Sequence, residues 1–116
     1  GIVTGRKSAA LDRRAKEIGI DLCFDGVARK GDLLETILAQ TGCACDEAAF
    51  IGDDIVDISI MNRVGVAIAV ADAEEAVKPY ADFVTASAGG RGAVREVCNA
   101  ILQAQGFWEG ILKKWE

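Results

Sequence analysis

Three aspartates follow one short apolar stretch of the chain, and they are the residues best suited to chemistry. Ala48-Ala49-Phe50-Ile51 contains no polar residue, and Gly52 leads from it to Asp53, Asp54 and Asp57. Neighbouring carboxylates in one turn repel each other, and a divalent cation with oxygen ligands relieves that repulsion. These aspartates are therefore a candidate cation site. An acidic turn in which one Asp caps a helix is the alternative.

The segments around these aspartates predict where they lie in the fold. An apolar run without alternating polar residues is typical of a strand that is buried on both faces. Behind the run, Val56, Ile60 and Met61 recur at helical spacing. Asp53 and Asp54 then lie in a strand-to-helix turn, at the carboxyl end of a strand, which is where open α/β sheets bind ligands.

Two more candidates follow the two preceding predicted strands. Thr4 comes after Ile2-Val3, and Lys30, next to Arg29, opens a predicted helix. A cation at a helix N-terminus opposes the helix dipole by up to about 1 kcal/mol, and a bound anion would offset that cost. A solvated surface charge is the alternative for Lys30. A hydroxyl, an ammonium and carboxylates at successive strand ends can hold a phosphoryl group beside Mg²⁺.

The whole chain alternates apolar runs with helical periodicity, which predicts an α/β fold, Rossmann-like, with a parallel sheet and helices on both faces. The run at 66–70 is expected to be a central strand, and 82–85 an edge strand. Strands are predicted at 2–3, 21–24, 48–51, 66–70 and 82–85, and helices at about 11–18, 30–40, 55–63, 73–77 and 94–105.

Composition narrows the function classes. The chain has 116 residues, 51% of them apolar and 27% charged, with a net charge of -5, which fits one globular domain. The acidic balance argues against nucleic acid or an anionic membrane as a partner, and no apolar run approaches the length of a membrane span.

The four cysteines predict a reducing, cytoplasmic environment rather than disulfides or a metal site. Cys23 lies in a predicted strand and Cys98 on the apolar face of a predicted helix, and both are expected in the core as free thiols. Cys43-x-Cys45 is too short for the usual C-x-x-C metal spacing, and the chain has no histidine to complete such a site.

The last ten residues form a separate pattern, so we divide the chain into a domain at 1–106 and a tail at 107–116. Trp108, Ile111, Leu112 and Trp115 occupy one face of a short predicted helix. This face either packs back on its own domain or makes a contact between subunits, where tryptophan is enriched.

Several motifs together resemble a known family. Ile2-Val3-Thr4-Gly5-Arg6, then Lys30, then Gly52-Asp53-Asp54-x-x-Asp57 resemble motifs II, III and IV of the haloacid dehalogenase superfamily. Segments 70–73, 81–85 and 89–97 are similar to the 3-deoxy-D-manno-octulosonate 8-phosphate (Kdo 8-phosphate) phosphatases. The resemblance covers residues 1 to about 105. It implies a Mg²⁺-dependent hydrolase that releases phosphate from a small phosphorylated sugar acid, in the synthesis of the Kdo sugar of lipopolysaccharide.

The resemblance also implies roles for individual residues. Asp53 would be a direct Mg²⁺ ligand, and Asp54 or Asp57 would act through water or orient its neighbours. Thr4 would hydrogen-bond a phosphoryl oxygen, and Lys30 would neutralise the phosphate. Family members without a cap domain form homotetramers in which neighbouring subunits help to cover the active site. The residues expected near the sugar acid are Gly5, Arg6, Gly89, Gly90 and Arg91.

One departure from the family pattern is large. The family's motif I is a strand ending in Asp-x-Asp, whose first aspartate forms an aspartyl-phosphate and whose second acts as acid and base. The chain begins instead at Gly1, with two apolar residues in place of the usual five or so of a strand. We therefore expect an absent N-terminal part, and with it a missing central strand between those that end at Thr4 and Gly52.

Three other functions are alternatives for this chain. A catalytically silent fragment that serves as a binding or assembly module fits the same residues. A phospho-acceptor receiver domain would place its acid pair near the N-terminus and its Lys after a late strand, which is the reverse of this order. A nucleotide-binding Rossmann domain is disfavoured because Gly89-Gly90-Arg91-Gly92 does not fit G-x-G-x-x-G.

Overall fold

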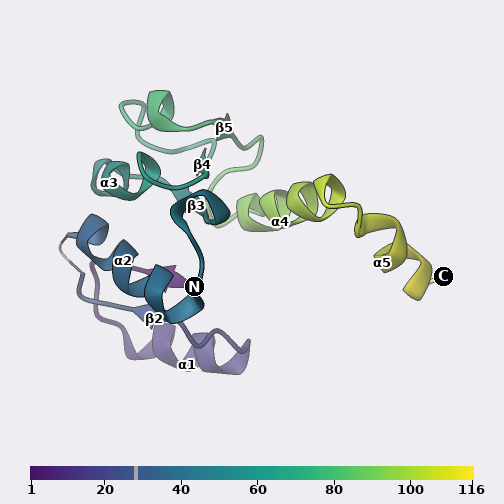
Figure 1. Cartoon of the computed structure of the whole chain (residues 1–116), viewed down its shortest axis with the longest axis horizontal. Coiled ribbons are helices and arrows are strands. Elements are labelled where there is room, and N and C mark those ends of the chain that lie inside the picture. Colours follow the sequence, from purple (N-terminus) through teal and green to yellow (C-terminus); the bar gives the residue numbers. More distant parts are fainter. Residues whose placement is uncertain (28) are drawn as a thin grey trace.

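Strands and helices alternate along the chain, as the periodicity predicts, and all strand pairs are parallel (Figure 1). The structure is a computed structural model that describes residues 1–27 and 29–116. The strands are β1 (Ile2–Val3), β2 (Cys23–Phe24), β3 (Ala49–Gly52), β4 (Val66–Ala69) and β5 (Phe83–Val84). The α-helices are α1 (Ala9–Glu17), α2 (Lys30–Thr41), α3 (Ile58–Met61), α4 (Ala93–Ala104) and α5 (Trp108–Lys114).

The strands form two sheets rather than the single sheet that the sequence predicts. One sheet pairs β1 with β2, and the other has the order β3-β4-β5. Strand β4 is central and β5 lies at an edge, which confirms both expectations. In the part of the chain that the structure describes, β1 and β3 do not pair with each other, and no strand pairs with both. The two sheets are connected instead through α2, which packs against α3.

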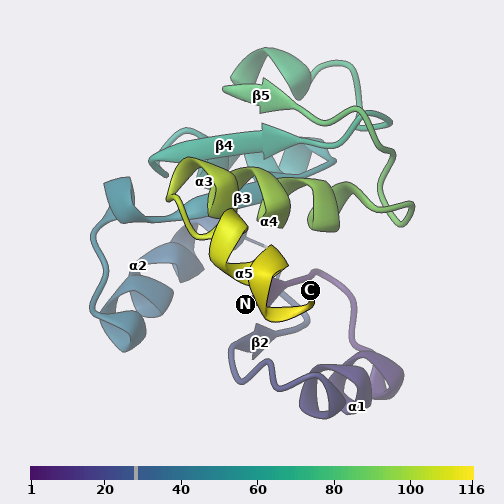
Figure 2. The same ribbon diagram turned by 90° about the vertical axis from the view of Figure 1, so that its right-hand side faces the viewer.

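The three-stranded sheet has a helix on each face. Figures 1 and 2 show α3 on one face of β3 and β4 and α4 on the other, which confirms helices on both faces for this sheet. The main core fills this half of the molecule and consists of small and medium apolar side chains. Its buried members are Met61, Ala67, Ala69, Val70, Ala73, Val77 and Ala93.

The start of one helix and the end of another have clear local causes. Helix α1 begins after Ser8, whose hydroxyl oxygen accepts the backbone N–H of Leu11 at 3.2 Å. Helix α2 ends at Gly42, which adopts a left-handed conformation with φ of 71° and donates its N–H to the carbonyl of Leu38.

The prediction of a helix at Ala73–Val77 is wrong. The segment forms turns, and the helical turn lies further on, as a 3₁₀-helix at Lys78–Tyr80 that contains Pro79. Tertiary contacts override helical spacing here, since Ala73 and Val77 are both buried and the N–H of Glu74 bonds the carbonyl of Asp53.

The helix after the acidic turn is also shorter than predicted. Residues Ile55–Asp57 form a 3₁₀ turn and only then does α3 begin. Ile60 and Met61 are buried as expected, whereas Val56 is exposed because the tighter turn rotates it away from the core.

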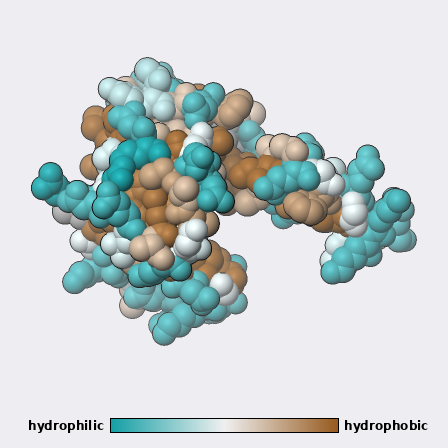
Figure 3. All heavy atoms as spheres, viewed as in Figure 1, coloured by the Kyte–Doolittle hydropathy of each residue, from teal (hydrophilic) through white to brown (hydrophobic). Residues whose placement is uncertain are grey.

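Helix α4 buries less of its apolar face than predicted. Ala93 and Val97 are buried, but Val94 is 61% exposed, and Cys98, expected in the core, is exposed as well. The physical reason is that α4 covers only the three-stranded sheet and extends away from the rest of the body (Figure 1). Figure 3 shows hydrophobic surface in the middle of the body and along α4.

The four cysteines are all free thiols, with Cys23 and Cys45 half-buried and Cys43 exposed like Cys98. Within the described ranges, every helix is too short or too polar to cross a lipid bilayer.

The split sheet generates a prediction about the isolated chain. The facing edges of β1 and β3 present unpaired backbone groups, and such edges favour pairing with another chain. We expect residues 1–116, expressed alone, to self-associate at micromolar concentrations, as measured by sedimentation velocity over a dilution series. A well-dispersed NMR spectrum from a monomer across that series would contradict the prediction.

Candidate active site

A polar cleft lies between the two sheets, where the carboxyl ends of their strands face each other. Its volume is about 620 Å³. One wall comes from the loops after β1 and β2, and the other from α2 and the turn after β3. The six predicted site residues that line it are Thr4, Gly5, Arg6, Lys30, Asp53 and Asp54. Gly26, Val27 and Val56 complete the lining; these three residues carry no chemical group that a sequence pattern would single out.

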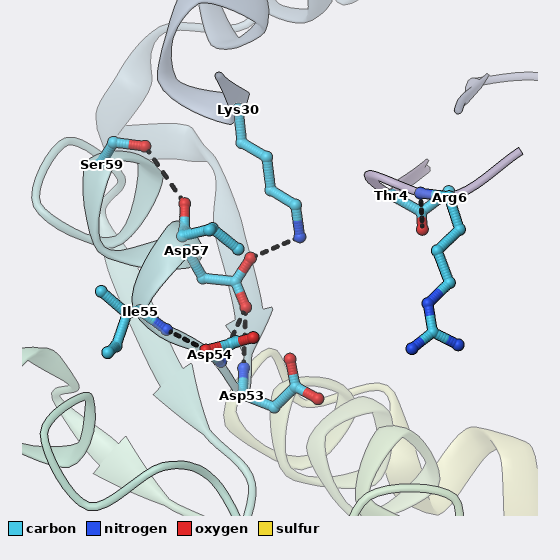
Figure 4. A network of polar contacts seen from close by, with 9 residues as sticks. Thr4, Arg6, Lys30, Asp53, Asp54, Ile55, Asp57 and Ser59 are labelled. Carbon is cyan, nitrogen blue, oxygen red and sulfur yellow. Dashed lines mark hydrogen bonds and ion pairs between the residues drawn. The ribbon is translucent and has the colours of Figure 1, made fainter. Parts of the chain in front are cut away.

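Asp57 lies behind the cleft and organises it (Figure 4). Its side chain is buried, and one carboxylate oxygen accepts the ammonium of Lys30 at 2.6 Å. The other oxygen accepts the backbone N–H groups of Asp53 at 2.9 Å and Asp54 at 3.1 Å. Burial raises the pKa of Asp57, but the Lys30 ammonium and the two N–H donors outweigh burial and hold the pKa below its usual range.

Two glycines permit this arrangement by allowing close approach. A Cβ on Gly52 would lie 2.8 Å from the Cβ of Asp57, and one on Gly31 would lie 2.9 Å from the Cβ of Ser59. Any larger residue at Gly52 would push Asp57 away from the turn, and any at Gly31 would separate α2 from α3. The close packing of α2 on α3 brings Lys30 within reach of Asp57.

Asp53 and Asp54 are exposed at the cleft and differ in their surroundings. Partial burial and the nearby charge of Asp57 raise the pKa of Asp53. The Asp54 carboxylate accepts the N–H of Ile55 at 2.7 Å and so caps the 3₁₀ turn. Oxygen donors of this kind suit Mg²⁺. Across residues 1–27 and 29–116, however, no three carboxylates or thiols converge on a common point as a complete metal site.

Thr4 and Arg6 face this acidic turn from the other side of the cleft (Figure 4). The backbone of Thr4 is fixed by its N–H, which donates to Phe24, and by its carbonyl, which accepts the N–H of Val27 at 3.0 Å. The Thr4 hydroxyl oxygen accepts the N–H of Arg6 at 3.2 Å. The cleft therefore places a hydroxyl and a guanidinium opposite an ammonium and two carboxylates, a set that can bind a phosphoryl group.

The predicted glycine-rich segment lies at the same end of the sheet but does not line the cleft. Gly89, Gly90 and Arg91 follow β5 and are exposed. Three polar side chains that sequence reasoning missed, Asp72, Thr85 and Glu96, make hydrogen bonds in and around this segment. They bond mostly to backbone groups, a partnership that leaves no spacing signal in the sequence.

Comparison with known proteins shows to which family the chain belongs. The family profile described as haloacid dehalogenase-like hydrolase matches residues 15–97. This chain therefore belongs to the haloacid dehalogenase-like hydrolases, as the motifs predicted.

Individual proteins of that family match this chain more closely than the general family profile describes. The 3-deoxy-D-manno-octulosonate 8-phosphate phosphatase of Yersinia pestis is 44% identical over 109 residues, which cover 94% of this chain and 58% of that protein. Its crystal structure superposes with a TM-score of 0.93 over 95% of this chain and 60% of that one. The chain thus spans little more than half the length of the curated relatives that it matches.

A third comparison concerns a structure with ligands. The phosphatase of the same name from Moraxella catarrhalis was crystallised in complex with magnesium ion, phosphate ion and KDO. It is 37% identical to this chain, with a TM-score of 0.95 over 99% of this chain and 66% of that one.

Because Asp57 accepts three donors in a buried place, we expect that removing its charge lowers the stability of the fold strongly. In Asp57→Asn the half-buried Lys30 ammonium loses its counter-charge, and the amide can no longer accept all three donors. Loss of one partner of a buried pair costs about 3–5 kcal/mol, and we expect the lower part of that range in urea denaturation at low protein concentration. The control is Asp54→Asn, because Asn caps helical turns about as well as Asp. Equal losses for both variants would contradict the role of Asp57.

Proposed function

We propose that this chain carries most of a Mg²⁺-dependent phosphomonoester hydrolase of the Kdo 8-phosphate phosphatase type. The observation that supports it best is the single cleft shared by Thr4, Lys30 and Asp53, which come from three successive strand ends. The predicted reaction converts Kdo 8-phosphate and water to Kdo and phosphate, in the synthesis of lipopolysaccharide. The relatives with that activity support the substrate class.

The residues of the cleft have distinct roles in this proposal. The Thr4 hydroxyl donates to a phosphoryl oxygen, and the Lys30 ammonium, held in place by Asp57, neutralises its charge. Asp53 would hold Mg²⁺ directly and Asp54 would do so through water, while Asp57 orients both, since its oxygens are already engaged. Bound Mg²⁺ would polarise a phosphoryl oxygen and neutralise developing charge. Gly5, Arg6 and the Gly89–Arg91 segment would lie near the sugar acid.

No residue of the chain is assigned as nucleophile or as general acid and base. We propose that an additional strand ending in Asp-x-Asp supplies both groups from a position between β1 and β3. Two cavities support this position. The polar cleft lies at the strand ends, and an apolar cavity of about 240 Å³, lined by residues that include Val3, Leu22 and Phe50, lies between the sheets. An apolar strand that ends in acidic residues would match both cavities.

This assignment predicts activity only for an extended chain. Residues 1–116 with Mg²⁺ should not release phosphate from Kdo 8-phosphate. A chimera that adds the N-terminal segment of the Yersinia pestis phosphatase should do so, and either Asp53→Asn or Lys30→Ala should lower its kcat/KM by at least about a hundredfold. Glu17→Gln, a remote change on α1, serves as the control.

The outcome also separates the two candidate functions. If residues 1–116 hydrolyse the substrate alone and Asp53→Asn abolishes that turnover, the nucleophile has been misplaced. If the chimera folds but stays inactive, a catalytically silent binding or assembly module becomes the better description. The absence of a complete metal site among residues 1–27 and 29–116 is what favours that second candidate.

We further propose that the protein is a cytoplasmic homotetramer and that the tail is a contact between subunits. Helix α5 packs against α4 and lies beyond it at the end of the chain, far from α1 (Figure 1). Trp108 and Ile111 are half-buried there, whereas Trp115 is 81% exposed. The free thiols support a reducing compartment.

The tail generates its own prediction for the chimera. Deleting residues 107–116, or changing Trp108 and Trp115 to Ala, should remove aromatic anchors and loosen the assembly by about tenfold or more in dissociation constant. The KM should rise more than kcat falls, because in this proposal a neighbouring subunit would help to cover the cleft. The control replaces Glu109 and Lys113 of the same helix by Ala. Unchanged sedimentation at low concentration together with unchanged kinetics would rule this contact out.

A further inference from the structure

The glycine-rich loop, residues 86–92, is fixed by two carboxylates from outside it. The two oxygens of Glu96 accept the backbone N–H groups of Ala86 and Ser87, each at 2.9 Å. An oxygen of Asp72 accepts the N–H of Gly89 at 2.6 Å. Each of these hydrogen bonds joins a neutral N–H donor to a charged carboxylate oxygen. Such hydrogen bonds are among the stronger ones in proteins.

The start of the loop is also tied to the end of β4. The hydroxyl of Thr85, a buried residue, accepts the N–H of Ala71 at 3.1 Å and donates to the carbonyl of Ser87 at 2.6 Å. Beyond these bonds, Gly90 and Gly92 have φ values of 71° and 99°, which favour glycine. The loop therefore has one defined path from β5 to α4.

The same bonds connect the loop to the acidic turn of the cleft. Asp72 begins a short segment whose Glu74 donates its N–H to the carbonyl of Asp53 at 2.8 Å, and Ala73 between them is buried. Two hydrogen bonds and one buried residue thus set the position of Gly89 relative to Asp53. The Arg91 side chain is exposed on the far part of this loop, and no ion pair within the described residues involves it.

We propose that Glu96 and Asp72 are positioning residues that fix Arg91 relative to the phosphate site and thereby set the preference for the organic part of the substrate. This inference rests on the proposed function for its substrate, but the loop contacts themselves do not. Neither carboxylate is used by the phosphoryl chemistry, because Asp72 and Glu96 do not line the cleft. Both carboxylates act instead on the backbone of the loop that carries Arg91.

The first experiment tests the contacts without substrate. In Glu96→Gln the side-chain amide can accept only one of the two N–H groups, so hydrogen exchange at Ala86 and Ser87 in residues 1–116 should accelerate about tenfold. In Asp72→Asn the faster exchange should appear at Gly89. The amide of Thr85, which donates to Ala69 within the sheet, should be unaffected in both, and Glu17→Gln is the charge-matched control. Unchanged exchange at all three loop amides overturns the proposal, whether or not the chimera is active.

The second experiment tests the consequence for specificity. In the chimera, Glu96→Gln should raise the KM for the sugar-acid phosphate about tenfold more than the KM for p-nitrophenyl phosphate, which has no sugar for the loop to contact. A general loss of structure would instead lower kcat for both substrates. Glu96→Asp, which keeps the carboxylate, should restore part of the difference. Equal changes in KM for the two substrates in both Glu96→Gln and Asp72→Asn overturn the specificity role even where the loop amides exchange faster.

Discussion

The arrangement of the cleft depends on one buried carboxylate that accepts donors from both halves of the molecule. Lys30 belongs to α2, which follows the two-stranded sheet, and the N–H groups of Asp53 and Asp54 belong to the turn after β3. Asp57 joins them at a point where the two sheets share no strand pairing. The packing of α2 on α3 reinforces this connection, since Arg63 bonds both Glu35 and the carbonyl of Gly31.

This carboxylate explains why neighbouring aspartates can serve different purposes. Burying an ion pair is favourable only when its remaining hydrogen-bonding capacity is satisfied, and Asp57 meets that condition with three donors. Partial burial and the charge of Asp57 both disfavour a charge on Asp53, so the pKa of Asp53 rises, while Lys30 and the two N–H donors lower the pKa of Asp57. One aspartate is fixed as part of the scaffold. The other keeps a carboxylate at the cleft whose charge a cation would stabilise.

The sequence predicted those parts that depend on local pattern. Helical spacing located α1, α2 and α4, and the placement of polar residues after apolar runs located Thr4, Lys30 and Asp53 at one cleft. The sequence did not predict the parts of the fold that depend on contacts between residues far apart in the chain. Ala73 and Val77 are buried in turns rather than in a helix, and α4 leaves Val94 exposed because it covers only part of the molecule. The backbone contacts of Glu96 could not be predicted, since any carboxylate on that helix fits the same pattern.

The separation of the sheets also bears on the order in which the chain folds. Strands β3, β4 and β5 pair in sequence order, Phe50 with Ala67 and Ile68 with Phe83, so each pairing closes a short loop. The first sheet likewise pairs Ile2 with Cys23. The entropic cost of closing a loop grows with its length, so pairing within each sheet costs less than pairing across the whole chain. Each half therefore forms its own strand pairs, and the cleft takes shape only when the halves dock and Lys30 meets Asp57.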